Sequence, residues 1–425
     1  MCGRFVRVLG MRRVRPGGPK PACAAVPGAG PLAACTPDAR GTRMPAVFSR
    51  RTPPGPRPSL DVSRRRLLGG ALAAAALPLL GTACGRTGQE KSGKGLTVTD
   101  LTGKNLELPG PARRVVTIPL PAASMVVAVN GGPDVLAGMN AASLTAIKGS
   151  FLGEAYPELL KVPTDVAGAE FAPNVESVLA RRPDVVIQWG DRGPGIVDPL
   201  RKAGLKVAQL TYGTQADLEG AIAMYGRLLG KRDRADRIAD GMRRRLKKLR
   251  TEIPGRAGPP PSVLYLRGAA DGLRVGGGDS YNHFVTELVG GRNPAAEIKA
   301  EQATIDVEQL LKWDPDIILL GNFGPATPQD MYDDPALASL RAVRERRIYK
   351  VPLGGYRWDP PSQESPLMWQ WLAGLVHGTG GAGLRAEVVR EYAFLYGAEP
   401  TDTQLDTILK LSANSGSRDY DDFGR

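Results

Sequence analysis

Two stretches of the chain repeat one pattern, VESVLARRPDVVIQ at residues 175–188 and VEQLLKWDPDIILL at residues 307–320. Both contain a Val-Glu pair, a Leu four residues after the Val, and a Pro-Asp pair that opens a run of aliphatic residues. A proline ends the preceding helix, and the aliphatic run then favours a buried strand. The repeat therefore predicts two copies of a helix–strand unit within one chain.

Aliphatic runs alternate with helical segments through most of the chain. The expected strands are 115–120, 183–189, 204–212, 262–268, 315–321 and 346–352, and the expected helices are 175–182, 281–290, 306–313 and 364–377. Strands separated by helices favour parallel sheets with helices on their faces. We predict an α/β fold with two Rossmann-like lobes, each around a central, mostly parallel sheet.

The segment between the two copies has no strand-like run. A helical period continues through residues 215–253, and Ile238, Met242 and Leu246 fall on one face of a helix that otherwise carries many Arg and Lys. A single apolar stripe among charges indicates a helix that spans between lobes. In open α/β sheets ligands bind beyond the carboxyl ends of the strands, so two facing lobes predict one shared cleft.

These patterns divide the chain into six parts. They are a leader with its signal (1–84), a flexible tether (85–95), an N-terminal α/β lobe (96–215), a helical linker (216–255), a C-terminal α/β lobe (256–411) and a disordered tail (412–425).

The leader carries an export signal. In SRRRLLGGALAAAALPLLGTAC, three arginines precede an apolar run of 14 residues, Leu67 to Leu80, which is shorter than the ~20 residues of a membrane-spanning helix. The start of this stretch resembles a twin-arginine signal. The start codon is either Met1 or Met44.

Cys84 follows the apolar run as in a lipoprotein signal. Gly81 departs from that pattern, because the third residue before the Cys is preferably Leu. We expect export and lipid attachment at Cys84, which would tether the protein to the outer face of the cytoplasmic membrane. Ordinary cleavage beside an unmodified Cys is the alternative.

The basic charge of the chain also lies in the leader. Fourteen Arg and Lys against two Asp within residues 1–83 account for +12 of the formal +13, so we expect no nucleic-acid partner. All four cysteines precede residue 85, and the chain has only two histidines, His283 and His377. A three-histidine site for a bare transition metal cannot be built from them, and we expect no metal site and no cofactor.

Several segments, taken in order, resemble one family. They are VTDLTGKNLELPGPARRVV, the two repeated stretches, VGGRN at 289–293, and GGYRWDPPSQESPLMWQWLAGLVHG, which begins at Gly354. Over residues 96–410 the chain resembles the ABC-transporter substrate-binding proteins that capture iron-siderophores, haem and cobalamin, and the last segment resembles the iron-chelate binders. The resemblance implies a monomeric binding protein, not an enzyme, that delivers a ferric chelate to a permease and its ATPase. Cobalamin, haem and nickel chelates remain alternatives.

The resemblance also assigns a role to the repeated glutamate. In this family one glutamate of each lobe docks onto arginines of the permease, and the matching positions are Glu176 and Glu308. Asn174 and Asp306 have the position of N-caps, so each glutamate also lies where a carboxylate stabilises a helix N-terminus by a few tenths to ~1 kcal/mol. Both roles are compatible.

Ferric chelates are large and often anionic, so their site needs aromatic faces and arginines in a wide cleft. Candidates follow the strands of the two lobes. They are Trp189, Arg192, Tyr212, Arg267, Tyr281, Asn322, Phe323, Tyr356, Arg357 and Trp358, with the cluster 356–358 the strongest because it lies in Gly- and Pro-rich sequence.

A secreted serine esterase is the alternative function that the sequence suggests. Gly278-Asp279-Ser280 followed by Tyr281 resembles the nucleophile block of an esterase family, with Ser280 as the attacking residue. That family needs this block after its first strand and an Asp three residues before its histidine. Neither condition holds for Ser280 and His377, so we expect Ser280 and Tyr281 to lie in a loop that enters the first helix of the second lobe, near the mouth of the cleft.

Overall fold

The structure is a computed structural model that describes residues 95–253, 258–268 and 272–425. The expectations for the leader, for Cys84 and for residues 85–94 of the tether lie outside these residues. Within them, no helix has the length and apolar character needed to cross a membrane.

The N-terminal lobe contains a four-stranded parallel sheet in the order β4-β3-β5-β6. Its strands are β3 (Val115–Thr117), β4 (Leu136–Met139), β5 (Val185–Trp189) and β6 (Val207–Leu210). A separate antiparallel hairpin is formed by β1 (Leu96–Thr99) and β2 (Asn105–Leu108). The helices of this lobe are α1 (Ala122–Asn130), α2 (Ala141–Lys148), α3 (Phe151–Ala155), α4 (Val175–Ala180) and α5 (Asp198–Lys202).

The C-terminal lobe contains a five-stranded sheet in the order β11-β10-β7-β8-β9. Its strands are β7 (Val263–Gly268), β8 (Leu273–Gly276), β9 (Gln302–Ile305), β10 (Ile317–Leu320) and β11 (Ile348–Lys350). Strands β11, β10 and β7 are parallel to one another, whereas β8 runs antiparallel to both of its neighbours, β7 and β9. The helices are α8 (Tyr281–Leu288), α9 (Val307–Trp313), α10 (Pro328–Tyr332), α11 (Arg341–Arg344) and α12 (Ser365–His377). The predicted α/β fold class is confirmed.

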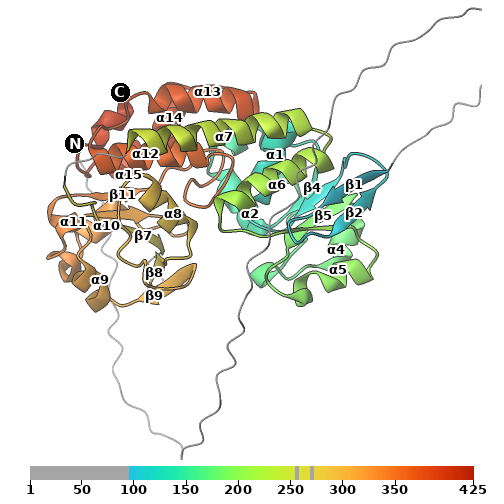
Figure 1. Ribbon diagram of the computed structural model, residues 1–425, viewed down its shortest axis with the longest axis horizontal. Helices are drawn as coiled ribbons and strands as arrows, with labels where there is room; N and C mark the ends of the chain where they lie inside the picture. Colours follow the sequence, from blue (N-terminus) through green and yellow to red (C-terminus); the bar gives the residue numbers. More distant parts are fainter. Residues whose placement is uncertain (1–94, 254–257, 269–271) are drawn as a thin grey trace, which may run out of the picture. The chain divides into compact units, whose positions relative to one another are not determined.

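A helical layer connects the two sheets. It contains α6 (Gln215–Leu228), α7 (Arg232–Glu252) and α13 (Leu384–Tyr396), followed by the short α14 (Asp402–Ile408) and α15 (Leu411–Asn414). Gly230, with φ of +67°, lies in the turn between α6 and α7. The 21-residue α7 contacts α1 of one lobe and α12 of the other, and it crosses both lobes in Figure 1.

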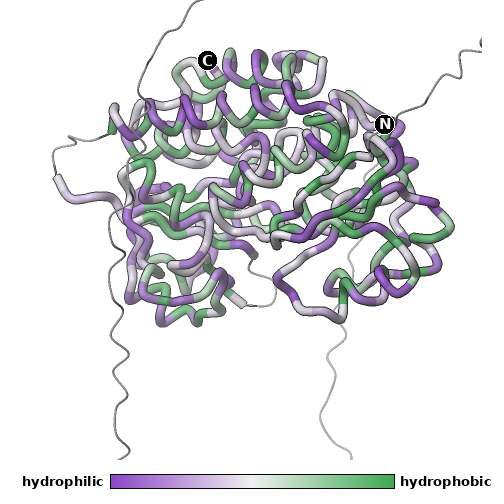
Figure 2. Tube along the Cα trace, turned by 45° about the vertical axis from the view of Figure 1, so that its right-hand side comes forward, coloured by the Kyte–Doolittle hydropathy of each residue, from purple (hydrophilic) through white to green (hydrophobic). Residues whose placement is uncertain are grey.

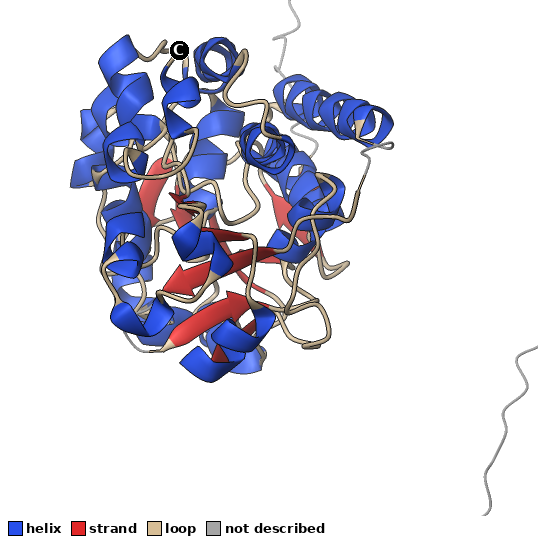
Figure 3. Ribbon diagram, turned by 90° about the vertical axis from the view of Figure 1, so that its left-hand side faces the viewer, coloured by secondary structure: helices blue, strands red, loops and turns tan. Residues whose placement is uncertain are grey.

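Successive side chains of the central strands point to opposite faces of each sheet and pack into separate cores. Ile187 of β5 and Leu319 of β10 join one core that continues through the helical layer, whereas Val186 and Ile318 face outer cores, one in each lobe. Figure 2 shows hydrophobic segments in the interior of the molecule, and Figure 3 shows helices around the strands. The shared inner core joins the lobes into one unit.

The C-terminal tail is ordered, which differs from the expectation. Residues 412–425, expected to be disordered, form part of α15 and a 3₁₀ turn at Tyr420–Gly424. Tyr420 and Phe423 are 1% exposed and stack with ring centroids 4.7 Å apart, and Trp371 donates a hydrogen bond to the Tyr420 hydroxyl at 2.9 Å. Two buried aromatic rings anchor a segment whose average composition is polar.

Candidate functional site: a cavity between the lobes

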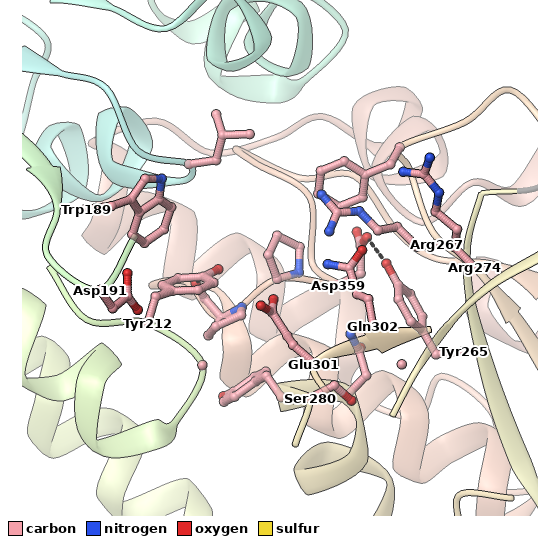
Figure 4. A pocket seen from close by; sticks show the side chains of 18 of the residues that line it. Trp189, Asp191, Tyr212, Tyr265, Arg267, Arg274, Ser280, Glu301, Gln302 and Asp359 are labelled. Carbon is pink, nitrogen blue, oxygen red and sulfur yellow. Dashed lines mark hydrogen bonds between the residues drawn. The ribbon is translucent and has the colours of Figure 1, made fainter. Parts of the chain in front are cut away.

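A cavity of about 680 Å³ lies between the two lobes and is lined by residues of both. Its walls come mainly from the carboxyl ends of β5, β6 and β7, from β8 and the start of β9, and from the loops that follow β5, β10 and β11 (Figure 4). Six of the ten residues predicted from the sequence line it, namely Trp189, Arg192, Tyr212, Arg267, Tyr281 and Phe323.

The N-terminal wall is aromatic. Trp189, the last residue of β5, meets Tyr212 and Phe171 edge-on, with ring centroids 5.3 and 5.8 Å away. The Arg192 guanidinium carbon lies 4.7 Å from the Trp189 ring centroid and 5.0 Å from that of Phe171. The Tyr212 hydroxyl donates to the carbonyl of Pro361 at 3.0 Å, which joins the wall to the segment before α12. This wall offers ring surfaces and one exposed cation.

The C-terminal wall combines cations with a buried acid. The guanidinium carbon of Arg267, which lines the cavity, lies 4.1 Å from the ring centroid of Phe323, and that of Arg357, which lies behind the wall, is 4.5 Å from the same centroid. On the inner side of these residues, the Tyr265 hydroxyl donates to Asp359 Oδ2 at 2.5 Å. Burial, together with the neighbouring Asp359, raises the pKa of Tyr265 well above its ordinary value of 10. Tyr265 is therefore a fixed hydrogen-bond donor.

Sequence reasoning did not select the other residues that line the cavity as ligand contacts, although it placed Ser280 near the mouth of the cleft. They are Leu120, Phe171, Asp191, Gly213, Tyr265, Arg274, Gly276, Ser280, Asn282, Glu301, Gln302, Asp359, Pro360 and Pro361. Arg274 and Gln302 lie on β8 and β9, the antiparallel strands that the strand–helix alternation did not predict. Asp359 lies directly after the predicted cluster at 356–358. The loop that was predicted to contact the ligand therefore does reach the cavity, but through an acid that was not among the predicted residues.

The remaining four predicted residues do not line the cavity, which corrects their expected role. Tyr356 and Trp358 are buried, with 1% and 0% of their surface exposed. Asn322 donates its side-chain amide to the carbonyls of Val351 and Pro352, at 2.8 and 3.1 Å. Arg357, which is also buried, donates to the Asn322 carbonyl at 3.0 Å. These residues support the wall from behind, since their polar groups are paired inside the protein.

A buried carboxylate explains why the side chains of the loop at 356–358 lie inside the protein. Glu364 is 0% exposed and accepts hydrogen bonds from Trp358 Nε1 at 2.7 Å and the Tyr392 hydroxyl at 2.6 Å. It also accepts from the Tyr396 hydroxyl and from the backbone N–H of Gly355. Burial raises the pKa of Glu364, and these donors oppose the rise. The carboxylate thus ties the loop to α13 and holds it in one conformation.

The two predicted docking glutamates occupy equivalent positions in the two lobes. Glu176 and Glu308 are each the second residue of a short helix, α4 and α9, and both are exposed. The predicted N-caps are confirmed: the Asn174 side chain accepts from Ser177 N–H, and Asp306 accepts from Gln309 N–H at 2.7 Å. Both helices lie on the side of their lobe away from α7 (Figure 1).

The positive and negative side chains that line the cavity are equal in number. Three arginines (Arg192, Arg267 and Arg274) and three acids (Asp191, Glu301 and Asp359) line it. Within the described parts of the chain, no ion pair joins any of them to another side chain. The same parts contain no group of three His, Cys, Asp or Glu arranged to hold a metal ion. The site is therefore suited to a ligand of mixed polarity.

Ser280 has a structural role in the described chain. It is the N-cap of α8, where its hydroxyl donates to the Gly277 carbonyl at 2.7 Å and accepts from the His283 N–H at 3.1 Å. The other histidine, His377, contacts the Val289 carbonyl at 3.0 Å. Neither imidazole is hydrogen-bonded to the Ser280 hydroxyl, so this geometry does not form the activated nucleophile that an esterase requires.

Two α/β lobes that enclose one cavity, with aromatic and charged side chains from both, define a bilobal ligand-binding protein. Residues 135–353 match the family described as periplasmic binding protein. The chain belongs to this family, which confirms the resemblance found in the sequence.

A crystal structure of a periplasmic solute binding protein from Veillonella parvula DSM 2008 is 30% identical, with a TM-score of 0.69 over 75% of this chain and 98% of that chain. The Fe(3+)-citrate-binding protein YfmC of Bacillus subtilis (strain 168) is 25% identical over 187 residues, 43% of this chain and 58% of that protein. A cobalamin-binding protein of Halobacterium salinarum (strain R1) is 26% identical over 229 residues, 53% of this chain and 58% of that protein. The chain thus spans less than two thirds of the length of either of these two relatives.

Proposed function

We propose that the protein is the extracytoplasmic substrate-binding component of an ABC importer, which captures a ferric-siderophore or a related metal chelate and delivers it to a permease. The observation that carries the proposal is the cavity of about 680 Å³, because one wall offers aromatic rings and the other offers arginines. Its volume falls in the range of pockets that enclose small organic ligands. The iron-citrate and cobalamin binding stated for the two relatives supports the chelate class.

Delivery requires a surface that the permease can recognise in both lobes. Glu176 and Glu308 support this function because each is exposed at the start of the same kind of helix. Two acids on separate lobes would contact two basic sites of the permease and favour one orientation of the complex. The long α7 and the shared core imply that ligand binding closes the lobes by a small movement only.

The leader supports export and lipid attachment at Cys84, which would tether the protein to the membrane that holds the permease. We expect the Cys84→Ser variant to shift from the membrane fraction to the soluble fraction when cells are fractionated. The same variant should keep its ligand affinity, since Cys84 precedes the lobes. An unchanged membrane fraction would contradict lipid attachment.

A direct binding experiment tests the function. The purified protein is titrated by calorimetry with a ferric hydroxamate, a ferric catecholate, haem, cobalamin and a nickel chelate, and any coloured ligand that co-purifies is identified from its absorption spectrum. Saturable binding of one of these compounds is expected. If none of them binds and no coloured ligand co-purifies, the proposed function is wrong. Ester hydrolysis that disappears in Ser280→Ala would instead favour the esterase.

A further inference from the structure

Asp359 is a buried acid at the cavity with one oxygen left unpaired. The residue is 1% exposed and lies in the loop between β11 and α12. Oδ2 accepts the hydrogen bond from Tyr265, whereas Oδ1 has no hydrogen-bond partner among the described residues. Figure 4 shows the pair on the C-terminal side of the cavity, across from Trp189 and Tyr212. A buried carboxylate oxygen without a donor is costly, so such a group calls for a partner.

The position of this acid is fixed by its surroundings. A Cβ atom at Gly321, directly after β10, would come within 2.4 Å of the Tyr265 hydroxyl and 2.9 Å of Asp359 Oδ2. The absence of a side chain at Gly321 therefore lets the Tyr265–Asp359 pair lie against the end of the sheet. Because the high pKa of Tyr265 keeps its hydroxyl protonated, this donor stays on Oδ2. Oδ1 remains the free acceptor.

The neighbouring cations do not satisfy Oδ1. Arg267 and Arg357 lie against the ring of Phe323, and neither makes an ion pair with Asp359 among the described residues. The two other acids of the cavity, Asp191 and Glu301, are exposed and can be hydrated. Asp359 is thus the one acid among these three whose hydrogen bonding depends on what enters the cavity.

We propose that Asp359 selects the ligand, by accepting a hydrogen bond from a protonated amine, amide N–H or hydroxyl group on the organic part of the chelate. This inference rests on the proposed function and narrows it to chelates whose scaffold carries a donor. A ligand with acceptors alone, such as ferric citrate with its outer carboxylates, would place negative charge against the buried acid and leave Oδ1 unpaired. Rejection by an unpaired buried group is a strong source of specificity.

A matched pair of ligands tests the selection without a substitution. The first ligand is the ferric complex of a linear trihydroxamate with a terminal primary amine, and the second is its phthalimide derivative, which has no N–H at that position. We expect the wild-type protein to bind the amine form at least about tenfold more tightly, as a charge-assisted hydrogen bond allows. Tighter binding of ferric citrate or haem than of the amine form would overturn the inference and leave the proposed function in place. Equal affinities of the two trihydroxamates would overturn the terminal amine as the donor to Asp359 and leave only the backbone amide N–H groups that both ligands share, which the Asp359→Asn variant tests.

The Asp359→Asn variant tests the same idea through the protein. The Tyr265 hydroxyl needs an acceptor, so the side-chain amide introduced at position 359 would turn its oxygen to Tyr265. Its N–H₂ group would then take the place of Oδ1 and face the ligand. We expect about a tenfold or greater loss of affinity for the amine form, or for cobalamin if that is the ligand bound, and a smaller loss or a gain for ferric citrate. Asp236→Asn, an exposed change on α7, should alter neither affinity.

The outcomes separate the two proposals. Unchanged affinities in a correctly folded Asp359→Asn variant would overturn the role of Asp359 whichever chelate binds. If Asp359→Asn does not fold, the matched ligands decide the matter in the wild-type protein. Failure of the wild-type protein to bind any chelate would remove the proposed function and this inference together.

Discussion

Asp184 and Asp316, the acids of the two repeated Pro-Asp pairs, make the same contact in the two lobes. Asp184 Oδ2 accepts from the backbone N–H of Arg114 at 2.9 Å, directly before β3, and Asp316 Oδ2 accepts from Ser262 N–H at 2.7 Å, directly before β7. The strand registers agree, because Val185 pairs with Val115 and Ile317 pairs with Val263. Each acid thus fixes the start of a central strand against its neighbour.

Removal of either acid should loosen the lobe that contains it. We expect Asp184→Ala and Asp316→Ala each to lower the free energy of unfolding by about 1–3 kcal/mol, because backbone N–H groups lose a charged acceptor. Amide hydrogen exchange should speed up at Arg114 in the first variant and at Ser262 in the second. The control is Asp421→Ala, an exposed change in the tail. Unaltered exchange at both amides would contradict the role of these acids.

Charge reversal at the docking glutamates should separate transport from binding. In the double variant Glu176→Lys and Glu308→Lys we expect uptake into cells to fall at least about tenfold, because a buried contact with a permease arginine becomes repulsive. Ligand affinity should stay within about twofold, since both side chains are exposed and outside the cavity. Glu399→Lys, another exposed reversal, should leave uptake unchanged. Normal uptake by the double variant would refute docking through these residues.

Trp189 should report ligand binding. Of the five tryptophans in the chain, Trp189 lines the cavity, whereas Trp313, Trp358, Trp369 and Trp371 do not. We expect Trp189→Phe to remove most of the ligand-dependent change in tryptophan fluorescence and to weaken binding by roughly three- to tenfold, since Phe keeps an aromatic face. Trp313→Phe should retain the full change. A complete response in Trp189→Phe would show that the ligand lies elsewhere.

Lys350 should make stability depend on alkaline pH. Its ammonium donates to the carbonyls of Gly321, Gly324 and Ala326 at 2.9, 3.0 and 2.9 Å, and burial lowers its pKa from 10.5 to about 8. Between these two values the unfolded chain binds more protons at this residue than the folded chain does. The contribution of Lys350 to the free energy of unfolding therefore rises with pH across that window and is lost as pH falls through about 8.

The measurement compares the wild-type protein with Lys350→Met, because other titrating groups then cancel. From pH 7.5 to 10 we expect the difference in unfolding free energy to shift in favour of the wild type by on the order of 2 kcal/mol. Lys247→Met, at an exposed position of α7, should show no such shift. A difference that is constant with pH would contradict the lowered pKa of Lys350.

Local patterns predicted most of the parallel strands and some of the helices beside them, but not the parallel strand β4 (Leu136–Met139) or the helices α1 and α2. The segments expected at 183–189 and 315–321 contain β5 and β10, and the helix expected at 364–377 is α12 from Ser365 to His377. Strands β8 and β9 escaped prediction because β8 has only four residues and β9 is a partly polar edge strand. The ordered structure of the tail was also not predicted, since Tyr420 is held by Trp371 and Tyr349, which are distant in sequence, and Phe423 stacks on Tyr420.

The sequence by itself determined the two-lobe architecture, because strand periodicity, proline and N-cap signals act over a few neighbouring positions. The family followed from the resemblance of several segments in their order along the chain. Only the tertiary structure decided which side chains reach the cavity. Trp358 was expected to contact the ligand because it lies in a Gly- and Pro-rich loop. In the structure its indole N–H instead donates a hydrogen bond to the buried Glu364, so its ring is buried. Asp359, the next residue, lines the cavity and has one buried oxygen without a partner among the described residues. The direction of a loop side chain depends on partners far along the chain, and those partners meet only when the lobes are assembled.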